Sequence, residues 1–114
     1  ELGQVYLNAG KFEEAIPHLK LVAESADPPP QVFARLGLAY LRARQNTKAL
    51  FWFHQALKQN DRDPVAAFFV GEEFYRQKEY TVAASYYERA SADPSYRDRA
   101  QSRLKEIEKE VLGQ

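Results

Sequence analysis

Apolar residues recur along this chain at spacings of three and four, the periodicity of an α-helix that buries one face. Val32, Leu36, Ala39 and Ala43 show this pattern, whereas alternation with a period of two is absent. Clusters containing proline, glycine and asparagine separate the periodic segments and indicate breaks between helices. We therefore predict an all-α chain of seven helices, the first ending near Leu7. The other helices are expected at residues 12–24, 30–43, 47–59, 64–77, 80–91 and 95–112.

Prolines also indicate where helices begin. Pro30 and Pro64 are predicted in the first turns of their helices, where the missing N–H is unimportant. Pro17 is expected slightly inside its helix, close enough to the start to remove only about one hydrogen bond. Because the links between the predicted helices are short, consecutive helices should pack antiparallel.

A second regularity is a 34-residue interval at which similar residue types recur, called the repeat interval below. Glycine and alanine suit places where two helices cross closely, and aromatic side chains fill the spaces between helices. A period of this length is typical of stacked helical hairpins, which usually function by presenting a surface to a partner. The recurring positions are Gly3, Gly37 and Gly71; Tyr6, Tyr40 and Phe74; Ala15, Ala49 and Ala83; Leu19, Phe53 and Tyr87; and Val22, Ala56 and Ala90.

These residues, together with the turn-like segment at residues 10–16, resemble the tetratricopeptide repeat over about residues 1–92. The resemblance implies a right-handed superhelical solenoid of antiparallel helix hairpins. Because the first repeat lacks half of its first helix, we expect the chain to be a fragment of a longer repeat protein. The expected parts are a truncated repeat at 1–29, a second repeat at 30–63, a third repeat at 64–94 and a C-terminal capping helix at 95–114.

The last predicted helix departs from the repeat pattern. One further interval places Leu104 and Lys105 at the positions of Leu36 and Gly37, and Glu108 at the aromatic position. The helix keeps one apolar stripe and is polar elsewhere, as expected of a helix that caps an array and keeps it soluble. The stripe consists of Ala100, Leu104, Ile107 and Val111.

The resemblance also implies a binding site, because the first helices of tetratricopeptide hairpins line a concave groove that holds protein ligands. The middle of this lining is apolar here, and Arg42 and Arg76 stand at one edge. We therefore expect a protein–protein interaction scaffold whose partner peptide or helix carries apolar anchors and acidic residues. The expected groove residues are Gln4, Leu7, Asn8, Gln31, Ala34, Leu38, Leu41, Arg42, Val65, Phe68, Glu72, Tyr75 and Arg76.

Composition narrows the function further. Sixteen basic and sixteen acidic residues give a net charge of zero, whereas nucleic-acid-binding proteins usually carry an excess of positive charge. No apolar run approaches the ~20 residues of a membrane-spanning helix, so we expect no membrane insertion. The lack of cysteine excludes a disulfide framework and thiolate chemistry, and leaves both a cytoplasmic and a periplasmic location open.

The residues that could carry chemistry favour structural roles instead. His18 and His54 have no partner at zinc-ligand spacing, and the segment from Asp61 to Glu72 lacks the glycine of a calcium loop. No nucleophile–base motif is present. We therefore expect no metal, no cofactor and no enzymatic activity. Glu73 stands where the family usually has alanine, so its carboxylate should either stay solvated at the groove edge or be paired.

Two alternatives to groove binding follow from the same sequence. Phe51, Trp52 and Tyr86 are predicted on the outer, convex side of the helices. They either pack against a neighbouring helix or form a second contact surface, which together with the open N-terminal end would make the chain a homo-oligomerisation module. The other alternative is an accessory domain that positions a protein substrate for a larger enzyme.

Overall fold

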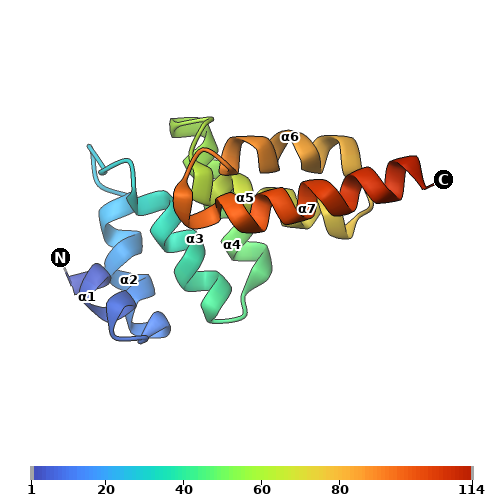
Figure 1. Cartoon of the computed structure of the whole chain (residues 1–114). Helices are drawn as coiled ribbons and strands as arrows, with labels where there is room; N and C mark the ends of the chain where they lie inside the picture. The colour runs from blue at the N-terminus through green and yellow to red at the C-terminus, as the bar shows by residue number, and fades with distance from the viewer. Residues whose placement is uncertain (1, 114) are drawn as a thin grey trace. The chain divides into compact units, whose positions relative to one another are not determined.

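The computed structural model describes residues 2–113, which form helices and short connections and contain no strand (Figure 1). The helices are α1 (Leu2–Asn8), α2 (Phe12–Ala23), α3 (Val32–Arg42), α4 (Asn46–Gln59), α5 (Pro64–Arg76), α6 (Tyr80–Ala90) and α7 (Pro94–Leu112). The predicted all-α helical repeat fold is confirmed, and helix ends differ little from the predicted ones. The described residues divide into two compact units, 2–60 with α1–α4 and 61–113 with α5–α7.

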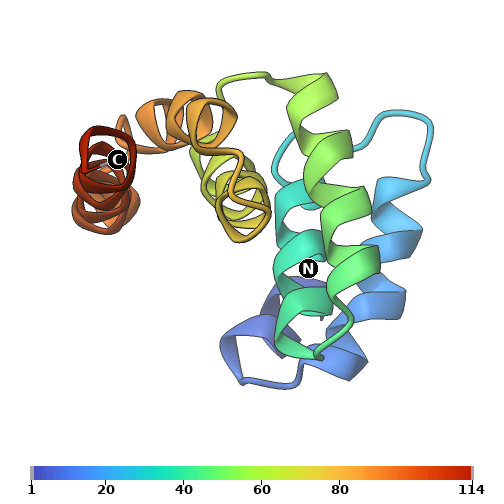
Figure 2. The ribbon, with the colours of Figure 1, turned by 90° about the vertical axis from the view of Figure 1, so that its right-hand side faces the viewer.

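In the first unit, α1 packs on α2, α2 packs on α3, and α3 packs on α4 (Figure 2). Gly37 lies where α3 and α4 approach most closely. A Cβ atom at this position would stand 2.7 Å from two atoms of the Phe53 ring, so the crossing requires glycine. The core of the unit includes Ala15, Leu19, Val32, Leu36, Ala39, Ala49, Phe53 and Ala56.

In the second unit, α5 and α6 form a hairpin, and α7 packs mainly on α6 and also on α5. The chain reverses direction between α6 and α7, so these two helices run antiparallel (Figure 1). Gly71 repeats the role of Gly37, since a Cβ atom there would lie 3.2 Å from the Tyr87 ring. The core of this unit includes Ala66, Ala67, Val70, Ala83, Tyr87, Ala90, Ala100 and Ile107.

The turns inside the α1/α2, α3/α4 and α5/α6 hairpins have the same backbone geometry. Gly10, Arg44 and Lys78 follow one another at the repeat interval and adopt left-handed φ angles of 78°, 64° and 62°. In each turn the N–H of the following residue bonds to the carbonyl five residues back, which closes a Schellman motif. Glycine adopts this conformation freely, whereas arginine and lysine are strained in it. The bonds join Lys11 to Tyr6, Gln45 to Tyr40 and Glu79 to Phe74.

The helices α5 and α7 each begin at an Asp–Pro pair. The Asp63 carboxylate accepts hydrogen bonds from the backbone N–H groups of Val65 and Ala66 at 3.0 and 3.1 Å. The Asp93 carboxylate likewise accepts one from the N–H of Ser95 at 2.7 Å. These caps satisfy backbone donors that have no partner inside the helix. Pro64 accordingly lies in the first turn of α5, as predicted.

The prediction for Pro30 is wrong, because α3 begins only at Val32. The N–H of Val32 donates to the carbonyl of Pro29 at 3.1 Å, and the first bond of α-helical spacing runs from Arg35 to Gln31. Pro30 has no N–H with which to start the ladder earlier, so it lies in the turn before the helix. Pro17 lies inside α2, where it was expected.

Candidate protein-interaction surfaces

Three of the predicted groove residues of α5, namely Phe68, Glu72 and Tyr75, contact the C-terminal helix α7. Phe68 was expected as an open apolar anchor, but its side chain is buried, with only 5% of its surface exposed. Its ring centroid lies 5.3 Å from that of Tyr96 and 5.8 Å from that of Tyr87. The Arg99 guanidinium lies 5.0 Å from the same ring. Phe68 therefore belongs to the core between α5, α6 and α7, because α7 supplies an aromatic ring and a cation that cover it.

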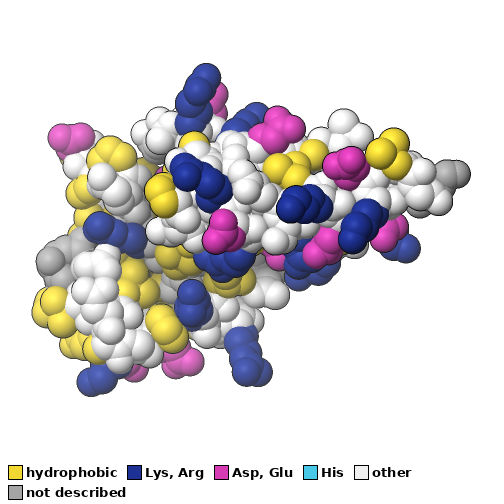
Figure 3. Space-filling model, viewed as in Figure 1, with side chains coloured by type: hydrophobic (Ala, Val, Ile, Leu, Met, Phe, Trp, Pro, Cys, Tyr) yellow, Lys and Arg dark blue, Asp and Glu magenta, His cyan; other side chains and the backbone are white. Residues whose placement is uncertain are grey.

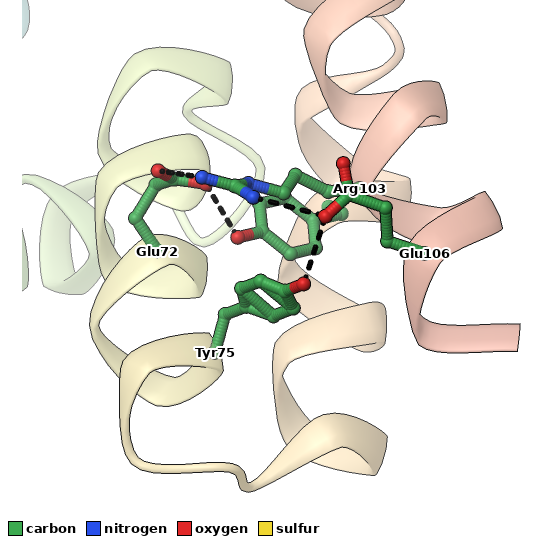
Figure 4. Close-up of polar contacts among 5 residues, drawn as sticks. Glu72, Tyr75, Arg103 and Glu106 are labelled. Atoms are coloured by element: carbon green, nitrogen blue, oxygen red, sulfur yellow. Dashed lines mark hydrogen bonds and ion pairs between the residues drawn. The ribbon is translucent and has the colours of Figure 1, made fainter. Parts of the chain in front are cut away.

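A polar network joins α5 to α7 beside this core (Figure 4). The Arg103 guanidinium donates to both carboxylate oxygens of Glu72, at 2.8 and 3.2 Å. It also donates to Glu106 at 3.2 Å and lies 4.6 Å above the Tyr75 ring. The Tyr75 hydroxyl donates to the same Glu106 carboxylate at 2.8 Å. Two of the predicted groove residues, Glu72 and Tyr75, are thus bound within the chain.

Tyr87, on α6, completes this network. Its hydroxyl donates to Glu72 at 2.6 Å, so that Glu72 accepts from two directions at once. Burial raises the pKa of Tyr87, and the hydrogen bond to Glu72 adds to the rise. The pKa of Tyr75 is also raised, in this case chiefly by its hydrogen bond to Glu106. Both tyrosines therefore stay protonated and act as donors.

The charged forms of Glu106 and Arg103 are favoured within this network. The hydrogen bond from Tyr75 lowers the pKa of Glu106, and the positive charge of Arg103 lowers it further. The hydrogen bond to Glu72 raises the pKa of Arg103, which keeps its positive charge. The side chains of Glu72, Tyr75, Arg103 and Glu106 thus form hydrogen bonds to one another, and these bonds attach α7 to α5.

Sequence analysis did not identify the α7 side of this surface. A cleft of about 460 Å³ runs between α5 and α7. Its α7 wall has charged residues at helical spacing, and this spacing could have indicated that they share one face of α7. The groove prediction drew only on the first helices of the hairpins, so it could not include them. The α7 residues that line the cleft are Asp98, Arg99, Ser102, Arg103 and Glu106.

The other two predicted groove residues of α5, Val65 and Arg76, lie outside this network. Val65 is partly exposed near the capped start of the helix. Arg76 is exposed and forms an ion pair with Glu73 one turn earlier. Glu73 also accepts a hydrogen bond from Gln77 at 3.2 Å. Its carboxylate is therefore paired within its own helix.

The predicted groove residues of the first unit have a different environment. On α3, Ala34 is buried, Leu38 and Leu41 are half-buried, and Arg42 is exposed, as is Gln31 just before the helix. Neither leucine can hydrogen-bond through its side chain, and Arg42 forms no ion pair with any described residue. This face of α3 therefore keeps apolar surface next to a positive charge.

The predicted residues of α1 add polar groups to the first unit. Gln4 and Leu7 are half-buried, whereas Asn8 is exposed. The Gln4 amide donates to the Asn8 side chain at 2.8 Å, which joins the two residues along one face of the helix. Both α1 and α3 pack against α2.

The outer aromatic residues divide into packed and exposed ones. Trp52 stacks on Phe33 with ring centroids 6.2 Å apart, and Tyr86 stacks on Phe74 at 5.6 Å. Phe51 contacts the edge of Trp52 but leaves 54% of its surface exposed. Packing within each hairpin thus accounts for Trp52 and Tyr86, and Phe51 is the exposed member of the set.

Two of the residues weighed for metal chemistry, His18 and Asp61, have structural partners. His18 stacks on Tyr6 with ring centroids 5.3 Å apart, and the backbone carbonyl of Asp61 accepts a hydrogen bond from Arg89. Within residues 2–113, no three side chains of the metal-binding types are grouped to hold an ion. In the same part of the chain, no helix has the length and apolar character to cross a bilayer.

Comparison with known proteins gives matches along most of the chain. The sequence model of the tetratricopeptide repeat family matches residues 1–64 and again residues 34–97. Mouse tetratricopeptide repeat protein 21B is 30% identical over 92 residues, which cover 79% of this chain and 7% of that protein. The type IV pilus assembly protein PilF of Pseudomonas aeruginosa is 29% identical over 80 residues, covering 68% of this chain and 32% of that protein. The chain spans less than a third of either relative.

Proposed function

The chain belongs to the tetratricopeptide repeat family. We propose that it is a protein-interaction scaffold that binds a partner peptide or helix on the first-helix surface that α7 leaves uncovered, the face of α3. The repeats are proposed at residues 1–29, 30–63 and 64–94, followed by the capping helix at 95–114. The chain acts by binding rather than by catalysis. Its partner presents apolar anchors and at least one acidic residue.

The face of α3 supports this proposal most strongly. Leu38 and Leu41 keep apolar surface exposed next to Arg42, whose charge has no partner among the described residues. Burying one such leucine contributes about 1.5–3 kcal/mol. Two anchors and one charge pair then give an affinity of about micromolar, once the entropy lost on association is deducted.

Leu38 provides the direct test. Binding of a synthetic amphipathic peptide with leucine anchors and glutamate flanks is followed by fluorescence anisotropy. We expect Leu38→Asp to weaken binding at least about tenfold, because it removes an anchor and adds repulsion. Arg42→Glu should weaken the same peptide and leave the fold intact, since Arg42 is exposed.

Leu21→Asp is the matched control, because Leu21 lies on α2 and is 73% exposed. It introduces the same charge and should leave the affinity unchanged. Circular dichroism verifies that each variant is folded. Equal binding by the wild type, Leu38→Asp and Arg42→Glu would rule out this face as the binding surface.

Self-association is a second candidate, favoured by the exposed Phe51 ring. Light scattering across concentration separates it from peptide binding. A peptide-binding scaffold remains monomeric, whereas an oligomerisation module grows in mass with concentration and loses that growth in Phe51→Ser.

A further inference from the structure

A groove between α6 and α7 lies on the side of α7 that does not contact α5. It encloses about 590 Å³, and we name it the α6/α7 groove. On a helix of about 3.6 residues per turn, its α7 residues Leu104 and Glu108 lie opposite Ser102 and Glu106, which line the α5/α7 cleft. The groove is therefore separate from the polar network and from the predicted groove residues. Its lining consists of Tyr80, Thr81, Ala84, Ser85, Glu88, Leu104, Ile107, Glu108, Val111 and Leu112.

The floor of the groove is apolar, and apolar side chains remain exposed along it. Ile107 is buried between the helices, while Ala84 and Leu104 are only partly covered. Val111 and Leu112 are 54% and 75% exposed. Figure 3 shows hydrophobic side chains between the two helices with acidic ones beside them. Several exposed apolar residues along one groove indicate a contact surface.

The position of Leu104 in the repeat indicates what covers such a surface. Leu104 follows Val70 by one repeat interval, as Val70 follows Leu36. Both earlier residues are fully buried, with 0% exposure, and each lies in the first helix of a two-helix hairpin. Leu104 has the same position on α7 but is only partly covered. On α7, this face is therefore shaped to receive a helix.

Lys105 determines where that helix can lie. It stands one repeat interval after Gly71, where a Cβ atom would lie 3.2 Å from the Tyr87 ring, so that glycine favours the close approach of the two helices. A lysine side chain prevents the same close crossing directly over α7. An added helix must therefore lie to one side, in the groove between α7 and α6. The stretch of α6 from Tyr80 to Glu88 offers it about 12 Å, roughly two turns.

The charged residues that line the groove indicate the charge of its partner. Glu88 and Glu108 are its charged residues, and both are exposed. Neither carboxylate has a hydrogen bond or ion pair with another described residue. Lys105 is exposed on α7 and does not line the groove. Basic side chains therefore complement the groove itself.

We propose that the α6/α7 groove binds an amphipathic helix of a partner protein, with apolar side chains over Ala84, Leu104 and Val111 and basic side chains against Glu88 and Glu108. This partner differs in sign from the acidic peptide proposed for α3. The two surfaces can therefore be tested independently, since each should reject the ligand of the other.

The probe is a synthetic helical peptide of about 14 residues, with leucine at i, i+3, i+4 and i+7 and lysine on both flanks. Its twin carries glutamate in place of each lysine. Titration followed by the amide shifts of α6 and α7 reports on this groove alone, and there we expect the basic peptide to bind at least about tenfold more tightly than the acidic twin, which should shift the α3 amides instead. Amide chemical-shift changes should centre on Ser85, Leu104 and Val111.

Charge reversal gives the decisive comparison. At the α6/α7 groove, Glu88→Lys/Glu108→Lys should lose the basic peptide and gain the acidic one, as read from the amide shifts of α6 and α7, and both exposed positions tolerate the change. Glu13→Lys/Glu14→Lys alters the net charge equally on exposed positions of α2 and should bind as the wild type does. Val111→Asp should weaken the binding of the basic peptide by removing an apolar contact, without unfolding the chain, and should leave the binding of the acidic peptide to α3 unchanged.

Several outcomes would overturn the proposal. Equal affinities of the two peptides for the α6/α7 groove, or equal losses in the two charge-reversal variants, would indicate general electrostatic attraction. Shift changes centred on α3 would place the basic peptide elsewhere. A wild-type dimer that dissociates in Val111→Asp would assign the groove to a second copy of the chain.

Discussion

The face of α3 and the face of α5 occupy matching positions in their hairpins but differ in what covers them. One repeat interval separates Ala34, Leu38, Leu41 and Arg42 from Phe68, Glu72, Tyr75 and Arg76, respectively. On α5, glutamate and tyrosine replace the two leucines, and both bond to α7. On α3 the leucines stay half-buried and make no such bonds. The position in the repeat thus determines where a side chain lies on its helix. The type of side chain determines whether that face can bind α7, as the face of α5 does.

The largest expected difference between the two faces concerns stability. Phe68→Ala should lower the free energy of unfolding by about 3 kcal/mol, because it opens a cavity in a closed core. Leu38→Ala should cost about 1 kcal/mol, since the leucine is already partly in contact with solvent. Urea unfolding followed by circular dichroism measures both values. Equal losses would mean that α7 does not close the α5 face in solution.

A smaller effect is expected from the network that attaches α7. Arg103→Gln removes the paired hydrogen bonds to Glu72 and should destabilise the attachment of α7 by about 1 kcal/mol, a value reduced by partial exposure. Hydrogen exchange of the α7 amides should accelerate, while exchange in α3 stays unchanged. Arg42→Gln is the control on the open face, where the arginine makes no ion pair with a described residue.

The same network predicts a dependence on pH. The pKa of Glu106 is lower in the folded chain than in the unfolded one, because Tyr75 donates to its carboxylate and Arg103 lies beside it. The folded state is therefore favoured above the ordinary glutamate pKa, and this contribution disappears as the pH falls through the lowered value. Exchange of the α7 amides should accelerate on acidification. Glu106→Gln should show a smaller change over that range.

The repeated part of the fold was predictable because its positions follow from the sequence interval. Gly37 and Gly71 had to face aromatic rings at close helix crossings, and they do so against Phe53 and Tyr87. The covering of Phe68 was not predictable in this way. It depends on which side of α7 faces α5, and α7 keeps the repeat pattern only in part: Leu104 follows Val70 at the interval, but Lys105 replaces the glycine.

The start of α3 and the strained turns show two further limits of the pattern. Three successive prolines indicated a break, but only the hydrogen bond from Val32 to Pro29 shows that Pro30 precedes the helix. Arg44 and Lys78 follow Gly10 at the repeat interval, so the sequence spacing could have indicated their left-handed conformation. The predicted helix bounds leave a break at each of the three turns, whereas the left-handed conformation of Arg44 and Lys78 was not predicted.

These turns give the smallest expected effect, and one that should be alike in both units. Arg44→Gly and Lys78→Gly each relieve a strained left-handed residue and should stabilise the chain by about 0.5–1 kcal/mol. Thermal unfolding measures each variant, and Lys48→Gly, inside α4, should instead destabilise by about 1 kcal/mol. Because both turns contain the same hydrogen bond, the two gains should be similar even though the faces of α3 and α5 differ. A gain at one turn only would show that the hairpins differ in their backbone as well as on their surfaces.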